Sequence, residues 1–149
     1  MIICTFVGHR EVYDSKAKEK LKAEIERIIK ENDGVEFFCG GMGEFDLLCA
    51  SEVRKQKRNY PDKDIKLYLI IPYLTQDINE NAEYYRQNYD EIIRPDCLMG
   101  VHYKSAIQKR NRYMIDKSDI IISYIRRKSG GAYQSYFYAK RKEKNVIEL

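Results

Sequence analysis

The chain lacks tryptophan, has no CxxC pair and contains no long apolar run. No segment approaches the roughly 20 apolar residues of a membrane-spanning helix, so we expect no membrane partner. The four cysteines are scattered and only two histidines accompany them, which predicts neither a metal site nor a disulfide framework. No charged leader precedes the first apolar residues, so we expect a cytoplasmic protein.

Two well-known phosphate-binding patterns are also missing. Neither the Walker phosphate loop nor the GxGxxG fingerprint occurs anywhere in the chain. The sequence therefore does not favour an ordinary NTPase or a nicotinamide-dependent dehydrogenase. We expect no cofactor.

The 149 residues carry a formal net charge of +4, and this length fits one domain over residues 1–149. A chain of this size buries roughly 70% of its unfolded surface without disulfides or metal. Its positive residues form local clusters at 54–58, 126–128 and 140–142. Such clusters attract phosphate-rich partners, but two of them fall at predicted helix C-termini, where cations complement the helix dipole. We therefore favour solvated helix ends over a nucleic-acid surface.

Short apolar runs alternate with amphipathic stretches along the whole chain. Strands are predicted at residues 1–7, 35–39, 65–71, 119–125 and 146–148. Helices are predicted at about 15–32, 44–58, 79–93, 105–117 and 130–142. Asp14 or Ser15 caps the first helix and Gly34 closes it. This order predicts an α/β, Rossmann-like fold, in which right-handed crossovers build a parallel sheet of about five strands with helices on both faces.

Three glycine-bearing turns follow predicted strands. They are Gly8-His9-Arg10, Gly40-Gly41-Met42-Gly43 and Ser129-Gly130-Gly131. In a parallel sheet such turns lie together on the carboxyl edge, where open α/β sheets bind ligands. Glycine lets the backbone approach a phosphate or ribose closely, and the helix that follows offers amide donors. The turns therefore predict one cleft for a small nucleotide-type ligand.

Three side chains beside these turns are candidates for specific roles. Arg10 is the first choice for a phosphate contact, because a guanidinium binds phosphate oxygens in a bidentate way. His9 can donate to the same ligand or take part in acid/base chemistry, although a lone histidine is more often a hydrogen-bonded structural group. Asp46 either binds a ribose hydroxyl or complements the positive end of the predicted helix.

Four segments together resemble the SLOG superfamily, and above all its YpsA-like branch of bacterial proteins. They lie at residues 5–10, 40–46, 111–119 and 130–133. The resemblance covers nearly the whole chain in order and implies a Rossmann-like fold with a nucleotide or nucleotide-derived ligand. It also makes Asn111 and Arg112 candidate ligand-binding residues. The competing structural interpretation pairs Arg112 with Asp116, four residues further on.

The same superfamily includes the LOG enzymes, which release a base from a nucleoside monophosphate through the motif Pro-Gly-Gly-x-Gly-Thr-x-x-Glu. In this chain Cys39 replaces the proline, Glu44 the threonine and Leu47 the catalytic glutamate. Glu44 and Asp46 can still supply a carboxylate near a sugar. A LOG-like hydrolase or transferase acting on an N-glycosidic bond is therefore the alternative function, with His9 as a further weak catalytic candidate.

Nucleic-acid binding is a third and weaker alternative. The superfamily relative DprA binds single-stranded DNA, and the basic clusters of this chain are available for such a partner. The sequence leaves open whether the protein is an enzyme and whether it forms a homo-oligomer.

Overall fold

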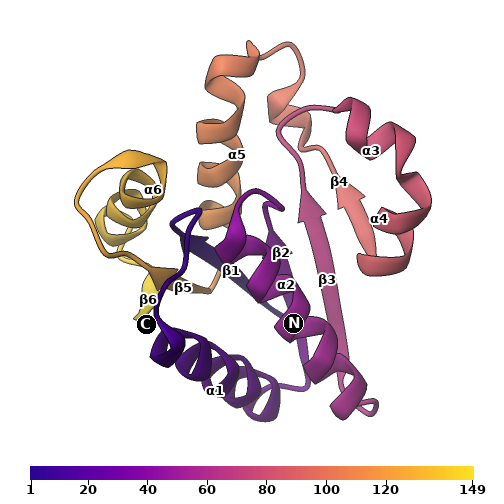
Figure 1. Cartoon of the computed structure of the whole chain (residues 1–149), viewed down its shortest axis with the longest axis vertical. Coiled ribbons are helices and arrows are strands. Elements are labelled where there is room, and N and C mark those ends of the chain that lie inside the picture. Colours follow the sequence, from indigo (N-terminus) through magenta and orange to yellow (C-terminus); the bar gives the residue numbers. More distant parts are fainter.

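Strand β1 lies inside a six-stranded sheet in which all neighbouring strands are parallel. A computed structural model describes all residues, 1–149 (Figure 1). The sheet order is β4-β3-β2-β1-β5-β6. The strands are β1 (Ile2–Gly8), β2 (Gly34–Cys39), β3 (Asp64–Ile70), β4 (Glu91–Ile93), β5 (Ile120–Tyr124) and β6 (Asn145–Glu148).

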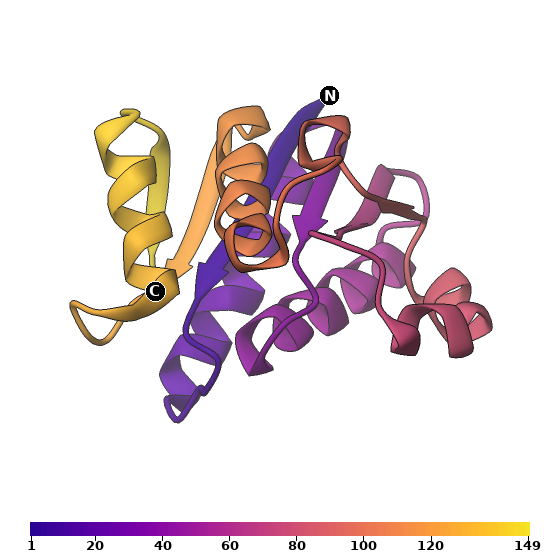
Figure 2. The ribbon, with the colours of Figure 1, turned by 90° about the horizontal axis from the view of Figure 1, so that it is seen from above.

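Helices cover both faces of this sheet. They are α1 (Ser15–Glu31), α2 (Glu44–Asn59), α3 (Gln76–Glu80), α4 (Ala82–Asn88), α5 (Tyr103–Lys117) and α6 (Gly130–Arg141), with a short 3-10 turn at Asp96–Leu98. Figure 2 shows α1 and α2 on one face and α5 and α6 on the other. No helix combines the length and apolar character needed to cross a membrane.

Strand β1 is apolar along most of its length because both of its faces are covered. Cys4 and Phe6 belong to the large core cluster that includes Ile25 of α1 and Phe45 of α2. Val7 points to the other face and belongs to the cluster formed with α5 and α6. Residues of one strand alternate between the two faces of a sheet, so a strand buried on both reads as a nearly continuous apolar run. The predicted α/β class and parallel sheet are confirmed.

The sheet has one strand more than expected, because the helix predicted over residues 79–93 is helical only up to Asn88 and its last three residues form a strand. The helical part breaks at Asn81, which ends α3 and precedes α4. Residues 91–93 then form β4 and pair with residues 68–70 of β3. Ile92 and Ile93 pack against the core from this position. The open edge of β3 offers backbone partners that a helix over these residues cannot use, and periodicity alone does not detect such pairing.

The bounds of α1 agree with the expectation, but the role expected of Gly34 does not. Asp14 caps the start, since its side chain accepts from the amides of Lys16 and Ala17. The helix then ends at Glu31, and the C-cap residue Asn32 donates from its side-chain amide to the carbonyl of Ile28. Gly34 is therefore not a helix cap and instead begins β2.

Gly8 allows α2 to approach the carboxyl end of β1 closely. A Cβ atom on Gly8 would lie 2.1 Å from Cδ2 of Phe45, in the first turn of α2. The Phe45 ring in turn stacks on Tyr124 of β5, with ring centroids 5.7 Å apart. Glycine at position 8 thus lets the start of α2 sit over the edge where β1 and β5 end.

We expect Gly8→Ala to lower the free energy of unfolding by about 1–3 kcal/mol, because the added methyl group requires space occupied by the Phe45 ring. Urea unfolding followed by circular dichroism measures this change. Gly131→Ala is the matched control, since a Cβ there meets nothing within 4 Å. The control should equal the wild type or gain up to about 1 kcal/mol. Equal stability of Gly8→Ala and wild type would contradict the packing argument.

Candidate functional site

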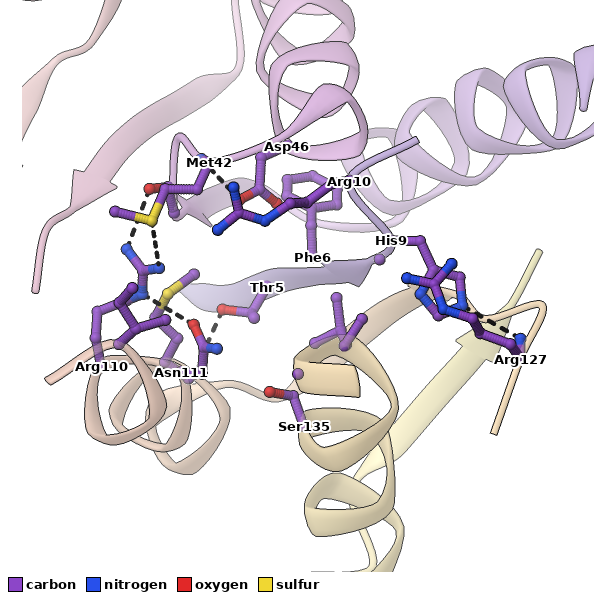
Figure 3. Close-up of a pocket in the computed structure, with 17 residues that line it drawn as sticks. Thr5, Phe6, His9, Arg10, Met42, Asp46, Arg110, Asn111, Arg127 and Ser135 are labelled. Atoms are coloured by element: carbon purple, nitrogen blue, oxygen red, sulfur yellow. Dashed lines mark hydrogen bonds between the residues drawn. The ribbon is translucent and has the colours of Figure 1, made fainter. Parts of the chain in front are cut away.

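The turns after β1 and β2 and the start of α6 surround a pocket of about 250 Å3 at the carboxyl edge of the sheet (Figure 3). Most of the predicted ligand-binding residues line it, namely Gly8, His9, Arg10, Gly40, Met42, Asp46, Asn111 and Gly131. The structure adds lining residues that were not predicted: Thr5, Phe6, Val7, Ile107, Arg110, Met114, Arg127, Ala132 and Ser135. Segments far apart in the sequence therefore meet in one cavity.

Several groups around the pocket attract anions. The Ser129 side chain makes no capping hydrogen bond at the start of α6, and Gly131 and Ala132 of the first turn line the pocket. Arg127 lies just before this helix and Arg10 just after β1, and neither forms an ion pair. Uncapped amides at a helix N-terminus and unpaired guanidinium groups both favour a negatively charged ligand.

His9 holds the loop that carries Arg127. Its side chain is only 3% exposed, and its Nε2 accepts hydrogen bonds from the amides of Arg126 at 2.9 Å and Arg127 at 3.3 Å. Burial lowers the pKa of His9, and the nearby charges of Arg127 and Arg126 lower it further. A neutral ring that accepts at Nε2 carries its proton on Nδ1. The basic nitrogen is therefore occupied by backbone contacts, which is the arrangement of a positioning residue.

Gly40 separates a carboxyl group from a buried guanidinium. A Cβ atom on Gly40 would lie 3.0 Å from Oδ2 of Asp46 and 3.2 Å from Cζ of Arg110. Asp46 accepts a hydrogen bond from the amide of Met42 at 3.1 Å. Burial nevertheless raises the pKa of Asp46 to about 6, although that bond and the charges of Arg110 and Arg10 act in the opposite direction. Asp46 can therefore gain or lose a proton near neutral pH.

Arg110 is the main site residue that the sequence prediction missed. It is 2% exposed and has no ion-pair partner. Its Nη1 donates to the carbonyls of Ile70 at 2.8 Å and Gly40 at 3.1 Å, and its Nε donates to Oδ1 of Asn111 at 2.9 Å. A helical spacing signal was available, because Arg110 lies three positions after Ile107 and four before Met114 on the apolar side of the helix.

Glu44 lies outside the pocket and fixes the loop that bears Arg10. Its amide donates to the carbonyl of Arg10 at 2.7 Å, and its Oε2 accepts from the amide of Val12 at 3.2 Å. Four other predicted binding residues do not line the pocket either, namely Gly41, Gly43, Ser129 and Gly130. They belong to the turns that shape it. Of the two carboxylates considered for sugar chemistry, only Asp46 lines the cavity.

Arg112 also lies away from the pocket, and its proposed pairing with Asp116 is wrong. The guanidinium carbon of Arg112 lies 5.1 Å from the centroid of the Tyr138 ring. Asp116 instead accepts a hydrogen bond from the Tyr138 hydroxyl at 2.7 Å. Both residues of α5 therefore contact the same tyrosine of α6, because that ring offers Arg112 a π face and Asp116 a hydroxyl donor.

The cysteines contribute no reactive group to this site. Cys4, Cys39 and Cys49 are buried, and burial raises the pKa of each thiol above its ordinary value. The thiolate, which is the nucleophilic and metal-binding form, is therefore disfavoured. No group of three His, Cys, Asp or Glu side chains has the arrangement to hold a metal ion.

The YpsA family model, described as the YspA SLOG family, matches residues 5–148. The chain belongs to the YspA SLOG family. The SPbeta prophage-derived protein YoqJ of Bacillus subtilis (strain 168) is 30% identical over 141 residues, which cover 85% of this chain and 81% of YoqJ. The resemblance to the YpsA-like branch is confirmed.

Solved structures share the fold of this YspA SLOG family member at low sequence identity. DNA processing protein A from Helicobacter pylori matches with a TM-score of 0.66 and 15% identity over 99% of this chain. The match spans 65% of the H. pylori chain. The molybdenum cofactor carrier protein from Chlamydomonas reinhardtii matches with a TM-score of 0.60 and 9% identity, over 100% of this chain and 77% of that one. At these identities the likeness establishes the fold alone.

The raised pKa of Asp46 predicts a specific pH dependence of stability. A carboxyl group with a higher pKa in the folded state than its ordinary 3.8 stabilises the fold when protonated, and this contribution disappears as the pH rises to about 6. Asp46→Asn lacks the ionisation, so its stability relative to the wild type should increase between pH 4 and 7 by about 1–3 kcal/mol. Urea unfolding of both proteins at a series of pH values measures this difference. A difference that stays constant with pH would contradict the raised pKa.

Proposed function

We propose that this protein binds a nucleotide or nucleotide derivative in the pocket at the carboxyl edge of its sheet. The observation that carries the proposal is an excess of positive charge in a preformed cavity. Arg10, Arg110 and Arg127 line the pocket together with a single carboxyl group, Asp46, so the lining holds three positive groups and one negative group even when Asp46 is ionised. A negatively charged ligand offsets this imbalance.

The two ends of the pocket suit different parts of such a ligand. Arg127 and the first turn of α6 lie at one end, where a phosphate can accept from guanidinium and backbone amides. Arg110 and Asn111 lie at the opposite end in Figure 3, with Asp46 nearby. A carboxylate and an amide there can hydrogen-bond to ribose hydroxyls or to the edge of a base.

The size of the pocket favours one nucleotide unit. A volume of about 250 Å3 lies just below the usual range for small-molecule sites, which suits a mononucleotide better than a fully enclosed dinucleotide. The Nη1 and Nε groups of Arg110 donate to protein acceptors. Arg110 therefore supplies positive charge and holds the turn after β2, whereas Arg10 and Arg127 are free to bind phosphate. The H. pylori structure of the same fold concerns binding of single-stranded DNA, which supports a ligand of nucleotide type.

Calorimetric titration with nucleoside mono- and diphosphates, ADP-ribose and NAD tests this function. We expect at least one of them to bind, and Arg10→Ala and Arg127→Ala each to weaken binding about tenfold or more, because each removes a charged hydrogen bond. Arg141→Ala is the control, since it removes the same charge from an exposed position outside the pocket. The proposal fails if no such ligand binds to the folded protein, or if the control weakens binding equally.

A second candidate function is cleavage of an N-glycosidic bond, and the position of Asp46 favours it. Asp46 lines the cavity, and its pKa of about 6 suits a general acid or base near neutral pH. Its protonated form can donate to the departing base, whereas its ionised form can activate water. Glu44 cannot share this role in the present geometry because its carboxylate contacts the amide of Val12 outside the pocket.

Chromatography of nucleotide substrates after incubation with the protein separates cleavage from simple binding. If the protein is a glycosidase, the wild type releases free base, Asp46→Asn reduces the rate at least about a hundredfold, and Glu44→Gln retains most of it. Absence of any released base from a nucleotide that binds would exclude this candidate and leave the binding function intact.

A further inference from the structure

A second concavity, of about 420 Å3, lies beside the outer edge of β3. Strand β3 begins at residue 64, but β4 pairs only with residues 68–70. The first part of the edge of β3 therefore has no neighbouring strand, and α2 and α4 flank the space. Its lining residues are Arg54, Lys57, Arg58, Leu67, Arg86, Gln87, Asn88, Tyr89 and Asp90.

The charge of this concavity is strongly positive. Arg54, Lys57 and Arg58 follow one another at spacings of three and one along α2, so they share one side of the helix. Arg86 contributes a fourth cation from α4. Asp90 is the single acidic residue of the lining, so four positive groups and one negative group leave three positive charges in excess.

Two of the four cations, Lys57 and Arg54, already contact protein groups. Asp90 accepts from Lys57 Nζ at 2.6 Å through one carboxylate oxygen and from the amide of Leu67 at 2.8 Å through the other. Arg54 donates to the carbonyl of Asn88 at 3.2 Å and lies over the Tyr89 ring at 5.7 Å from its centroid. These contacts join α2 to the segment between α4 and β4 and hold Arg54 in place.

Two arginines remain without a strong partner. Arg58 forms no ion pair, and Arg86 lies 3.9 Å from Glu83 with 74% and 75% of the two side chains exposed. The helix dipoles account for cations near the ends of α2 and α4 taken one at a time. The helix dipoles do not explain why the positive ends of two helices line the same concavity. Like charges placed there repel one another unless an anion lies between them.

We propose that this concavity is a second anion site, which takes linked phosphoryl groups. Guanidinium groups bind phosphate oxygens in pairs, and three positive charges of the lining remain after the carboxylate of Asp90 is counted. A volume of about 420 Å3 also leaves room for more than one phosphate. The linked phosphates belong either to a free polyphosphate or to the backbone of a single-stranded nucleic acid.

The second site is separate from the nucleotide pocket. Asp46 of that pocket lies in the first turn of α2, whereas Arg58 lies in its last turn. The 12 positions between 46 and 58 correspond to roughly 18 Å along a helix. One rigid helix thus carries part of each site, and ligands at the two sites can be tested independently.

Titration of the full chain with inorganic tripolyphosphate and with a single-stranded oligonucleotide tests this proposal. The Arg10→Ala/Arg127→Ala variant is used beside the wild type, so that the first pocket does not contribute. We expect Arg58→Gln/Arg86→Gln in either background to weaken binding about tenfold or more. The control, Lys18→Gln/Lys55→Gln, removes the same charge from exposed residues outside the concavity and should change affinity less than about twofold.

The outcomes identify the source of the phosphates and separate this site from the first one. Arginine-dependent binding of tripolyphosphate alone assigns the site to free polyphosphate, and such binding of the oligonucleotide assigns it to a strand. The proposal is overturned if Arg10→Ala/Arg127→Ala abolishes binding of a probe while Arg58→Gln/Arg86→Gln leaves that binding unchanged. The probe would then bind in the first pocket. The proposal is also overturned if neither probe binds, or if the control variant weakens binding as much as Arg58→Gln/Arg86→Gln.

Discussion

Strand β1 pairs in parallel with both β2 and β5, and this pairing sets the arrangement of the other elements and of the first pocket. Cys4 pairs with Phe37 on one side and with Ile120 on the other, and Gly8 pairs with Tyr124 at the end of the strand. Because parallel neighbours run in the same direction, each connection must return to the opposite edge through a helix. The turns after β1, β2 and β5 therefore lie at one edge, and the first pocket forms where they meet.

The first pocket also depends on charges held away from water. Burial of an ion costs several kcal/mol unless hydrogen bonds and opposite charges offset it. Arg110 meets this cost through the carbonyls of Gly40 and Ile70, which lie near the ends of β2 and β3. For Asp46, burial instead raises the pKa to about 6, so the carboxyl group stays neutral up to a higher pH than an exposed one. The lining of the cavity therefore holds more positive than negative groups, which favours a negatively charged ligand.

The two positive sites lie at different places on the sheet. The first lies where the strands end and helix N-termini begin, as is usual for ligand sites in open α/β sheets. The second lies where β4, with three residues, leaves part of the seven-residue β3 without a neighbour. Since α2 contributes residues near both of its ends, its close packing against Gly8 positions the two sites relative to one another.

The amino-acid sequence was sufficient to predict the order of most strands and helices, the parallel sheet and the edge at which the glycine turns meet. These features follow from periodicity and turn chemistry within short segments, which is why Arg10, Gly40 and Asp46 could be found. The roles of β4, His9 and Arg110 became clear from the folded chain. Each depends on partners far along the chain: β4 on the open edge of β3, His9 on amides 117 and 118 positions away, and Arg110 on a carbonyl 70 positions away. Patterns within a short segment do not predict such contacts, because the groups come together only when the chain folds.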